Sequence, residues 1–332
     1  MIIVTGGAGF IGSNLVAGLN ARSEERILVV DNLSNAGKIK NISDCRIQDY
    51  LDKVDFRERI KKNESFGSIE AVFHQGACSD TMQSDGRYVM DNNYQYSKEL
   101  LAYCTMHKIP FIYASSASVY GDGKVFTEAL ENEKPLNAYA YSKWLFDCFV
   151  RNQSFQTQVV GLRYFNVYGE REQHKGRMAS VAYHFYNQFQ ESGRVRLFEG
   201  TDGYANGEQR RDFIYVDDVV KVNMFFLDNP TKSGIYNAGT GRSGTFNDVA
   251  CAVIDRCKGG SKDTISLQHR ISDNMIEYIG LPDKLEGKYQ SFTEANMDTL
   301  RSEGYRNQFA DVSTGVADYV DLMNRSNQNP SG

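Results

Sequence analysis

The feature of this sequence that most restricts its fold is a glycine-rich segment close to residue 1. The letters GGAGFIG place Gly6, Gly9 and Gly12 in a G-x-x-G-x-x-G pattern, between an apolar run at 1–5 and a helical pattern at 13–20. Glycines in such a turn let the backbone bend sharply and approach a pyrophosphate, whose charge is stabilised at the helix N-terminus. The segment therefore predicts the first strand, turn and helix of a dinucleotide-binding βαβ unit.

An acidic residue at the end of the second predicted strand supports this interpretation. Asp31 follows the apolar run 27–30 and lies 19 residues after Gly12. A purely structural turn does not account for Asp31, whereas a carboxylate there can accept hydrogen bonds from the adenosine ribose and favours NAD. Lys38 and Lys53 favour NADP, because either ammonium group can pair with a 2′-phosphate, although a lone surface lysine is more often simply solvated. From the residues alone, the choice between NAD and NADP stays open.

The rest of the chain alternates between strand and helix patterns. Short apolar runs at 71–73, 111–114 and 159–163 are separated by helical patterns such as 94–106 and 141–151. This alternation predicts an α/β fold with a Rossmann-type, doubly wound parallel sheet. After about residue 168 the pattern changes to a polar and basic loop at 169–177, a helix at 178–191 and a stretch rich in Gly, Asp and Asn at 200–207. We therefore expect a dinucleotide-binding domain at 1–168 and a smaller, mixed α/β, mainly substrate-binding domain at 169–330, with the option that some later segments return to the first domain.

Composition excludes several other classes of function. The net charge of -5 and the pI near 5.7 argue against nucleic acid, which requires a basic face. The sequence opens without a signal-peptide pattern or a long apolar run, so we expect a cytoplasmic protein with no membrane partner. The six cysteines and five histidines are scattered without metal-site spacing, so no metal is predicted.

A second group of candidate cofactor contacts follows the third apolar run. The letters FHQGACS at 73–79 contain Gln75, Gly76, Ala77, Cys78 and Ser79, whose small members allow a cofactor to lie against the end of a strand. Ligands of open α/β sheets bind at that edge. Asn92 is predicted to begin the next helix, where it either reaches the same crevice or, as is more common, caps the helix.

The strongest chemical signal is a serine, tyrosine and lysine set. Tyr139 and Lys143 are four residues apart and share one helix face, and Ser116 lies upstream in ASSASVYG. A phenol with a pKa near 10 is a poor base at neutral pH, and a neighbouring ammonium group favours its ionised form. We expect Tyr139 to be the acid–base residue, Lys143 to lower its pKa and hold the cofactor ribose, and Ser116 to orient the substrate oxygen. Such a Tyr–Lys pair also arises by chance in a chain with 20 tyrosines, but Ser116 and the glycine turn make chance a poor account; Tyr141 lies on a different helix face.

These motifs resemble a known family. GGAGFIG, ASSASVYG and the Tyr139–Lys143 pair, with RYFNVYG and RDFIYVDDV downstream, resemble the extended short-chain dehydrogenases/reductases. FHQGACS, DNNYQYSKELL, NVYGEREQHKGRMASVAYH and LFEG are similar to the ADP-L-glycero-D-manno-heptose 6-epimerases over nearly the whole chain. That resemblance implies an isomerase that oxidises C6 of ADP-heptose with bound NADP, rotates the aldehyde and returns the hydride to its other face, in synthesis of the lipopolysaccharide core heptose precursor. It also implies a homo-oligomer, a pentamer.

The resemblance assigns further residues to the site. Lys175, in a loop with Arg171, His174 and Arg177, matches the family's second catalytic residue; without the resemblance, this loop reads equally well as a solvated basic segment. Contacts to NADP are implied for the glycine turn and for Phe10, Ile11, Asp31, Asn32, Lys38, Lys53, Gln75, Gly76, Ala77, Cys78, Ser79, Asn92, Lys143, Val167 and Lys175. Contacts to ADP-heptose are implied for Asn166, Arg177, His184, Phe198, Glu199, Gly200, Thr201, Arg211 and Tyr289. Two features depart from the family: Arg177 stands where serine is more usual, and the segment 202–210 is longer than typical.

Three other functions share part of this sequence pattern. A UDP-glucose/galactose 4-epimerase shares the first half of the chain and the Ser/Tyr/Lys set but does not need Lys175. A 4,6-dehydratase requires an acid pair beside the catalytic serine, where this sequence has Ala117 and Ser118. A non-catalytic dinucleotide-binding protein would tend to lose the Ser/Tyr/Lys set, which is complete here.

Overall fold

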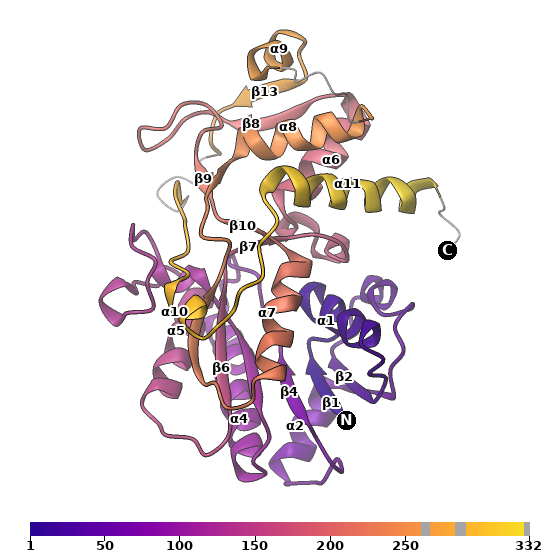
Figure 1. Ribbon diagram of the computed structural model, residues 1–332, viewed down its shortest axis with the longest axis vertical. Helices are drawn as coiled ribbons and strands as arrows, with labels where there is room; N and C mark the ends of the chain where they lie inside the picture. The colour runs from indigo at the N-terminus through magenta and orange to yellow at the C-terminus, as the bar shows by residue number, and fades with distance from the viewer. Residues whose placement is uncertain (260–265, 283–289, 329–332) are drawn as a thin grey trace. The chain divides into compact units, whose positions relative to one another are not determined.

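The computed structural model describes residues 1–259, 266–282 and 290–328 (Figure 1). The chain divides into two compact units, each assembled from separate segments. The first comprises Met1–Tyr164, Val219–Ala238 and Asn296–Arg306, and the second comprises Phe165–Asp218, Gly239–Ala295 and Asn307–Gly332. The first unit thus ends four residues before the boundary expected at 168 and takes in two later segments. Within the described ranges, no helix is both long and apolar enough to cross a membrane.

The first unit contains the parallel sheet that the alternating pattern predicts. Over the described residues the sheet has seven strands in the order β11-β6-β5-β4-β1-β2-β3, and every neighbouring pair is parallel. The order reverses direction between β1 and β4, which is where ligands of doubly wound sheets bind. The strands are β1 (Ile2–Thr5), β2 (Ile27–Asp31), β3 (Asp49–Asp52), β4 (Ala71–His74), β5 (Phe111–Ser116), β6 (Val159–Tyr164) and β11 (Gly234–Ala238).

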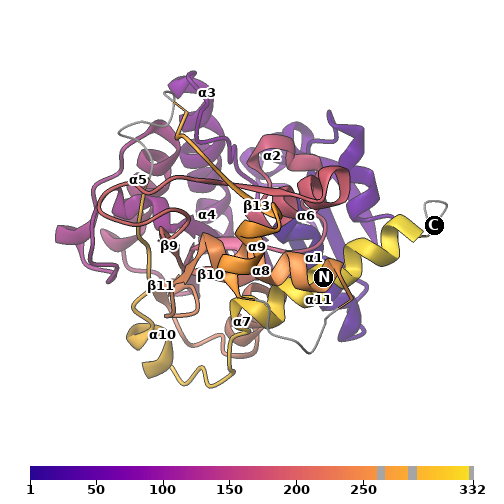
Figure 2. The same ribbon diagram turned by 90° about the horizontal axis from the view of Figure 1, so that it is seen from above.

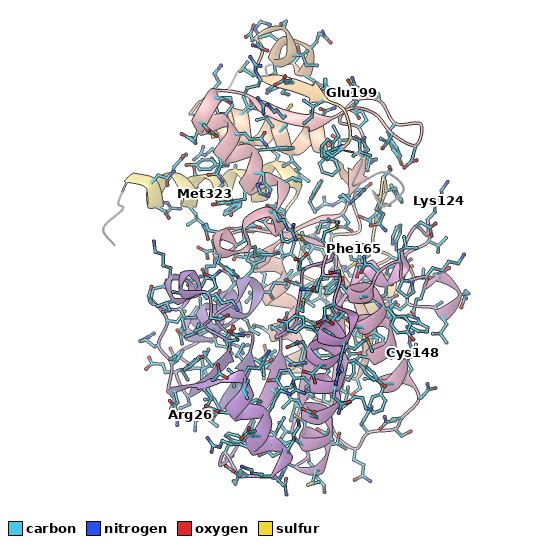
Figure 3. All side chains as sticks on the ribbon, turned by 180° about the vertical axis from the view of Figure 1, so that it is seen from behind. Arg26, Lys124, Cys148, Phe165, Glu199 and Met323 are labelled. Atoms are coloured by element: carbon cyan, nitrogen blue, oxygen red, sulfur yellow. The ribbon has the colours of Figure 1, made fainter. Side chains whose placement is uncertain are left out.

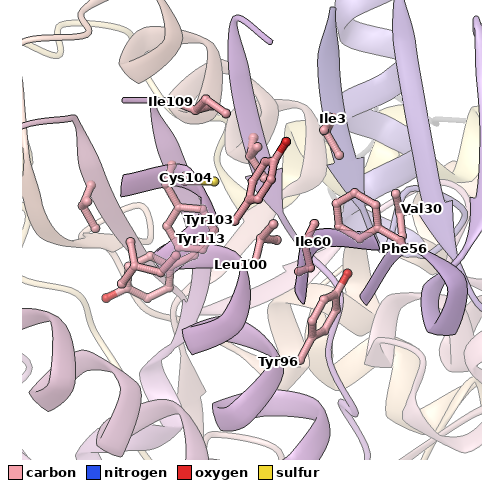
Figure 4. Packing of buried hydrophobic residues seen from close by; sticks show 14 of the residues in the cluster. Ile3, Val30, Phe56, Ile60, Tyr96, Leu100, Tyr103, Cys104, Ile109 and Tyr113 are labelled. Carbon is pink, nitrogen blue, oxygen red and sulfur yellow. The ribbon is translucent and has the colours of Figure 1, made fainter. Parts of the chain in front are cut away.

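Helices cover both faces of this sheet, which explains why its inner strands are apolar throughout. On one face, Phe56 of α2, Leu100 of α4 and Phe146 of α5 join strand residues such as Ile3 and Val30 in one buried cluster (Figure 4). The other face carries α1 and α7, which approach each other where a Cβ on Gly18 would lie 2.6 Å from Val220 (Figure 1). The helices of this unit are α1 (Phe10–Ala21), α2 (Lys53–Lys61), α3 (Gly86–Met90), α4 (Tyr96–Met106), α5 (Ala138–Arg151), α10 (Asp298–Ser302) and α7 (Val216–Asp228) from Val219 onward, with short helical turns η1 (Ala36–Asn41), η3 (Ala117–Tyr120) and η4 (Leu130–Asn132).

Three helix starts differ from the sequence prediction, each because of its cap. The first helix begins at Phe10, because Gly9 takes the extended N-cap conformation without any side-chain cap. The helix predicted to start near residue 94 begins at Gly86, where the Asp85 carboxylate accepts a hydrogen bond from the Tyr88 amide, and it runs through a π-helical turn, η2 (Asp91–Gln95), into α4. Asn92 lies inside this π turn, so the prediction that it starts or caps a helix is wrong. The α5 helix begins at Ala138, capped by Asn137, and so includes Tyr139.

The second unit is built on three short strand pairs and a helical layer. In the described residues, β7 (Asn166–Tyr168) pairs with β10 (Phe213–Tyr215), β9 (Arg210–Arg211) with β12 (Gly244–Thr245), and β8 (Val195–Phe198) with β13 (Ile276–Ile279). Helix α8 (Phe246–Cys257) packs against both α6 (Val181–Ser192) and α11 (Val312–Gln328) (Figures 1 and 2). The remaining elements are η5 (Gln173–Met178) and α9 (Leu267–Ser272).

Candidate active site

The glycine turn between β1 and α1 has the geometry expected of a phosphate-binding loop. Gly6 has a φ of +66°, and a Cβ there would lie 2.6 Å from the Gly76 backbone nitrogen. A Cβ on Gly12 would collide with the Gly6 carbonyl oxygen. The Gly9 amide donates to that same carbonyl at 2.9 Å, and α1 begins directly afterward at Phe10 and Ile11. Each glycine therefore allows a close backbone approach, which fits a pyrophosphate at the start of α1.

Asp31 lies at the end of β2, but its carboxylate is engaged within the protein. One carboxylate oxygen accepts from the Ala8 amide at 2.9 Å, and the other accepts from the Asn32 amide at 2.6 Å and from Lys38 Nζ at 2.9 Å. Asp31 is only 5% exposed. The carboxylate thus stabilises the glycine turn, and the Lys38 ammonium group compensates its negative charge.

Lys53 lies close to Lys38. Its Nζ donates to the side-chain oxygen of Asn92 at 2.6 Å, which brings the start of α2 to the π turn. Burial lowers the pKa of Lys53, and the positive charges of Arg57 and Lys38 lower it further. Lys38 is therefore near enough for its charge to act on Lys53, and a phosphate bound between two such cations would stabilise both.

The loop after β4, residues 75–79, is held by a buried hydrogen-bond chain that the sequence did not reveal. The Gly76 amide donates to Thr5 Oγ1 at 3.2 Å, and Thr5 Oγ1 is 2.7 Å from His74 Nδ1. His74 Nε2 is in turn 2.9 Å from Ser97 Oγ. Burial lowers the pKa of His74 to about 3, with a smaller contribution from the charge of Lys143, so the imidazole is neutral at physiological pH.

Asn93 of the π turn holds the far end of the same loop. Its side-chain oxygen accepts from the Cys78 amide at 2.7 Å, and its Nδ2 donates to the Cys78 carbonyl at 3.0 Å and to Ser142 Oγ of α5 at 3.0 Å. Gln75, at the start of the loop, accepts a hydrogen bond from Tyr164 at 3.0 Å. Ala77 and Ser79 lie in the loop between and beside these fixed points. Residues from β1, β4 and the π turn thus hold this loop in place.

Ser116, Tyr139 and Lys143 come together where β5 ends against α5. Lys143 is 5% exposed, and its Nζ donates to the Ala114 carbonyl at 2.6 Å. Burial raises the pKa of Tyr139, and its hydrogen bond with Ser116 acts in the opposite direction. Burial also lowers the pKa of Lys143 to about 8. The raised pKa of Tyr139 is the reverse of the shift expected from Lys143: desolvation of the phenol outweighs the hydrogen bond with Ser116, Cys78 raises the pKa further, and Lys143 is not among the groups that shift it.

Lys175 and its loop lie in the second unit. The Lys175 amide donates to the Glu172 carbonyl at 2.9 Å, and the Glu172 side chain is fully buried. That carboxylate accepts from the Ser180 amide at 2.6 Å, from Ser180 Oγ at 2.7 Å and from the Gly169 amide at 3.4 Å. Burial lowers the pKa of Lys175, and Glu172 raises it. The loop is therefore anchored by a buried acid, Glu172, which the basic pattern of the loop did not indicate.

The other residues expected to bind substrate are also in the second unit. Asn166 lies in β7, beside the expected cofactor contact Val167, and the Asn166 side-chain oxygen accepts from Thr293 Oγ1 at 3.4 Å. Arg211 is 6% exposed, and its guanidinium carbon lies 5.8 Å from the centre of the Phe246 ring. The other members are Arg177 in η5, His184 on α6, and Phe198, Glu199, Gly200 and Thr201 at and after the end of β8, with Glu199 labelled in Figure 3. Tyr289 falls outside the described residues.

The segment 202–210, which was expected to be longer than typical, is fixed by its own contacts. Asn247 Nδ2 donates to the Asn206 carbonyl at 2.9 Å and to the Glu208 carboxylate at 2.6 Å. Asn206 accepts from the Gly200 amide at 2.9 Å, and Gln209 Nε2 donates to the Glu199 carbonyl at 2.7 Å. The segment therefore stabilises the backbone at 199–200, which belongs to the expected substrate contacts.

Comparison with known proteins gives a consistent assignment. Residues 2–239 match the model of the NAD dependent epimerase/dehydratase family. A protein of Thiobacillus denitrificans described as ADP-L-glycero-D-manno-heptose-6-epimerase is 55% identical over 327 residues, covering 98% of each chain. The crystal structure of the Helicobacter pylori ADP-L-glycero-D-manno-heptose-6-epimerase is 30% identical with a TM-score of 0.80, covering 97% of this chain and 96% of that one.

A less similar solved structure has the same fold and is named for a different substrate. The Thermus thermophilus UDP-glucose 4-epimerase, solved in complex with NAD, is 28% identical with a TM-score of 0.77 and covers 97% of this chain and 98% of that one. The family description and the geometry of the glycine turn together assign a nicotinamide dinucleotide cofactor to the first unit. The chain therefore belongs to the NAD dependent epimerase/dehydratase family and, within it, to the ADP-L-glycero-D-manno-heptose-6-epimerases.

Proposed function

We propose that this chain is an isomerase that inverts C6 of ADP-D-glycero-D-manno-heptose, giving the L-glycero isomer, through transient oxidation and re-reduction. The observation that carries the proposal is the cluster of Ser116, Tyr139 and Lys143 at the end of β5, in the same unit as the dinucleotide turn. The 55% identity to a named heptose 6-epimerase supports the choice of substrate. A bound nicotinamide would supply reversible hydride transfer at C6, to one face and back to the other, so there would be no net oxidation.

Each residue of the cluster has a distinct task in this reaction. As a phenolate, Tyr139 accepts the proton of the C6 hydroxyl group as the hydride leaves, and Lys175 donates the proton to the carbonyl oxygen once that oxygen has rotated to its new position. Because burial raises its pKa, Tyr139 is protonated at rest, and stabilisation of the phenolate must come from its neighbours. Ser116 supplies a hydrogen bond to the phenol oxygen, and Lys143, with a pKa of about 8, supplies a positive charge at neutral pH.

Lys175 is proposed as the second acid–base residue. Rotation of the aldehyde moves the carbonyl oxygen by half a turn, so a group other than Tyr139 is needed to exchange a proton at the new position. The lowered pKa of Lys175 suits this task, because it brings the neutral amine closer to physiological pH. Glu172 anchors the loop that carries it.

NADP is proposed as the cofactor in preference to NAD. The Asp31 carboxylate is engaged by the Ala8 amide and Lys38, so its repulsion of a 2′-phosphate is compensated. Lys38 pairs with this carboxylate, and its charge also acts on Lys53, so two cations are available to a 2′-phosphate. A Lys53→Met variant should weaken NADP binding by about tenfold and leave NAD binding unchanged, since one charged hydrogen bond contributes about 1.5 kcal/mol. Equal losses for the two dinucleotides would contradict the assignment.

The decisive experiment follows C6 configuration by NMR. The purified protein is incubated with ADP-D-glycero-D-manno-heptose, and in parallel with UDP-glucose, and the dinucleotide released on denaturation is identified. Inversion of the heptose alone, with NADP released, supports the proposal. Conversion of UDP-glucose alone would contradict the proposal and indicate a 4-epimerase.

A variant distinguishes catalysis from binding alone. Tyr139→Phe should lower kcat by at least about 10²-fold while the dinucleotide stays bound, because the acid–base group is lost and the turn is intact. Unchanged turnover in Tyr139→Phe would remove Tyr139 from its role. Absence of turnover in the wild-type protein with bound dinucleotide would favour a non-catalytic binding protein.

The family resemblance supports three wider proposals. The enzyme would act in the cytoplasm, in synthesis of the lipopolysaccharide core heptose precursor, and it would assemble as a homopentamer. Light scattering on the purified protein tests the assembly, since five copies of a 37.5 kDa chain give a mass clearly different from that of a dimer or tetramer.

A further inference from the structure

Helix α5 presents a row of three polar side chains to strand β5. Tyr139, Lys143 and Asp147 follow each other at intervals of four residues, so they lie along one face of the helix. Tyr139 is hydrogen-bonded to Ser116 at the end of β5, and Lys143 Nζ donates to the carbonyl of Ala114. Asp147 contacts β5 one helical turn beyond Lys143. The two turns of α5 that carry the proposed catalytic residues are thus followed by a turn whose polar residue has no direct part in the proposed reaction.

Asp147 is fully buried, and its carboxylate accepts three hydrogen bonds from two strands. Tyr113 donates through its hydroxyl group at 3.0 Å and Ser115 through its hydroxyl group at 2.9 Å. Arg163 of β6 donates through Nε at 2.9 Å, and its side chain is also 0% exposed. A single carboxylate on the catalytic helix therefore ties that helix to both β5 and β6.

Arg163 has a second carboxylate partner that is not on α5. Its NH2 group lies 2.6 Å from Glu133, and its NH1 group donates to the Tyr120 hydroxyl at 3.0 Å. Glu133 is also paired with Arg151 at 2.7 Å. The buried cluster thus contains two carboxylates of similar burial, of which only Asp147 lies one turn from Lys143.

We propose that Asp147 is a positioning residue of the Ser116–Tyr139–Lys143 centre, holding α5 in register with β5 and placing a fixed negative charge one helical turn from Lys143. This inference rests on the catalytic roles proposed above. A displacement of α5 by even one ångström would separate Tyr139 from Ser116, and misplacements of that size cost enzymes up to about 10²-fold in rate.

The titratable groups near Lys143 come from three elements. Asp147 and the protonated Tyr139 are on its own helix, Cys78 is in the loop after β4, and His74 is on β4 and neutral; of these, Asp147 and Cys78 act on Lys143. Burial lowers the pKa of Lys143 to about 8, while Asp147 and then Cys78 oppose that change. Loss of the Asp147 charge therefore lowers the pKa of Lys143 further and leaves less of it protonated at neutral pH.

The test is the pH dependence of kcat for Asp147→Asn. This variant retains the shape of the side chain and removes its charge. We expect the alkaline limb of the kcat profile to move to lower pH by about one unit, the usual effect of one nearby opposite charge, with KM for the sugar nucleotide nearly unchanged. A folded Asp147→Asn protein whose alkaline limb stays in place would overturn the proposal.

Glu133→Gln is the matched control. It removes the other buried carboxylate of Arg163, so it should lower the free energy of unfolding, but its charge does not act on Lys143 and the alkaline limb should not move. A limb that moves equally in both variants would assign the effect to general loosening of the cluster and overturn the specific role of Asp147.

Removal of a buried charge partner can also prevent folding, so a milder variant provides an independent readout. Tyr113→Phe removes one hydrogen bond to Asp147 without a change in charge. Hydrogen exchange of the α5 amides should become faster in this variant, while the alkaline limb stays in place; unchanged exchange would overturn the register role.

Measurement of Tyr139→Phe in the same assay separates failure of the Asp147 proposal from failure of the proposed catalytic centre. Loss of turnover in Tyr139→Phe with an unmoved limb in Asp147→Asn rejects Asp147 alone. Full turnover in Tyr139→Phe rejects the centre itself.

Discussion

Tyr139 and Lys143 lie in a buried site, where desolvation favours the neutral form of each side chain. Burial raises the pKa of Tyr139 and lowers that of Lys143 to about 8. If the reaction forms a phenolate at Tyr139, Lys143 must stay charged to stabilise that phenolate. Catalysis at this centre should therefore depend on the protonation of Lys143 within the ordinary working range of pH.

The first prediction concerns that protonation. Below about pH 8 Lys143 is mostly an ammonium group, and above it mostly a neutral amine. We expect kcat to fall as the pH rises through about 8. In Lys143→Arg the residual activity should show no such limb, because a guanidinium stays charged. A limb that persists near pH 8 in Lys143→Arg would show that another group titrates there.

The second prediction concerns Ser116. Ser116→Ala removes the hydrogen bond that opposes the raised pKa of Tyr139, so kcat should fall by about 10²-fold or more. Ser118→Ala is the control, because Ser118 donates to Ser116 Oγ at 2.9 Å. Its effect on kcat should be within about threefold. Equal effects of the two substitutions would speak against direct action of Ser116 on the phenol.

At the scale of elements, the cofactor site depends on where strands end and helices begin. The turn between β1 and α1 packs against the loop after β4 through the Gly6 and Gly76 backbones. The π turn η2 interrupts the helix from Gly86 to Met106 and brings Asn92 and Asn93 to Lys53 and Cys78. The π turn therefore links this edge of the sheet to α2 through Asn92 and to the loop after β4 through Asn93.

The third prediction tests the glycine turn. A Cβ on Gly12 would collide with the Gly6 carbonyl oxygen, so Gly12→Ala must displace the turn and should abolish measurable dinucleotide binding in a titration. Gly86→Ala is the control, because no atom lies within 4 Å of a Cβ built there. The control should bind normally and gain about 0.5 kcal/mol in unfolding free energy. Normal binding by Gly12→Ala would refute the role of this glycine.

The fourth prediction concerns the contact between α2 and α4. Arg57 is paired with Asp91 at 2.7 Å and with Glu99 at 2.9 Å, and its side chain is 13% exposed. Arg57→Met should lower the free energy of unfolding by about 2 kcal/mol at pH 7. Arg22→Met, which removes an exposed pair with Asp228, should cost less than about 1 kcal/mol.

The ion pairs of Arg57 with Asp91 and Glu99 also make the stability lost in Arg57→Met depend on pH. Hydrogen bonds from Arg57 lower the pKa of Asp91, and with Lys61 they lower that of Glu99 against the opposing effect of burial. Carboxylates with lowered folded-state pKa values stabilise the fold above their unfolded values, 3.8 and 4.5, and lose that effect as the pH falls through the folded values. The difference between wild type and Arg57→Met should therefore shrink below pH 4.5. A constant difference down to pH 2.5 would contradict the charge-based account.

At the scale of the whole molecule, each unit is completed by chain segments that are distant in sequence. Val219–Ala238 supplies most of α7 and the edge strand β11 to the first unit, and Asn296–Arg306 supplies α10. Folding of the cofactor-binding unit therefore requires most of the chain to be present. Ligand binding to that unit should consequently stabilise the molecule as a whole.

The fifth prediction follows from this linkage. At a free NADP concentration 100 times its Kd, the folded protein should be stabilised by about 2.7 kcal/mol. NAD at the same concentration should stabilise it less, because it lacks the phosphate that Lys38 and Lys53 would bind. Thermal unfolding of protein stripped of its dinucleotide measures both shifts, and a larger shift with NAD would reverse the proposed preference.

The sequence by itself determined the features that depend on short spacing. The glycine turn, the alternation of strands and helices and the Tyr139–Lys143 pair are patterns within a few residues or one βαβ unit, and they led to the parallel sheet and to the family. Only the tertiary structure decided which distant polar groups meet. Asp31 binds Ala8 and Lys38, His74 joins Thr5 to Ser97, and Asp147 pairs with Arg163. Such partners are set by strand order and by the need to satisfy every buried polar group, and no local pattern in the chain encodes them.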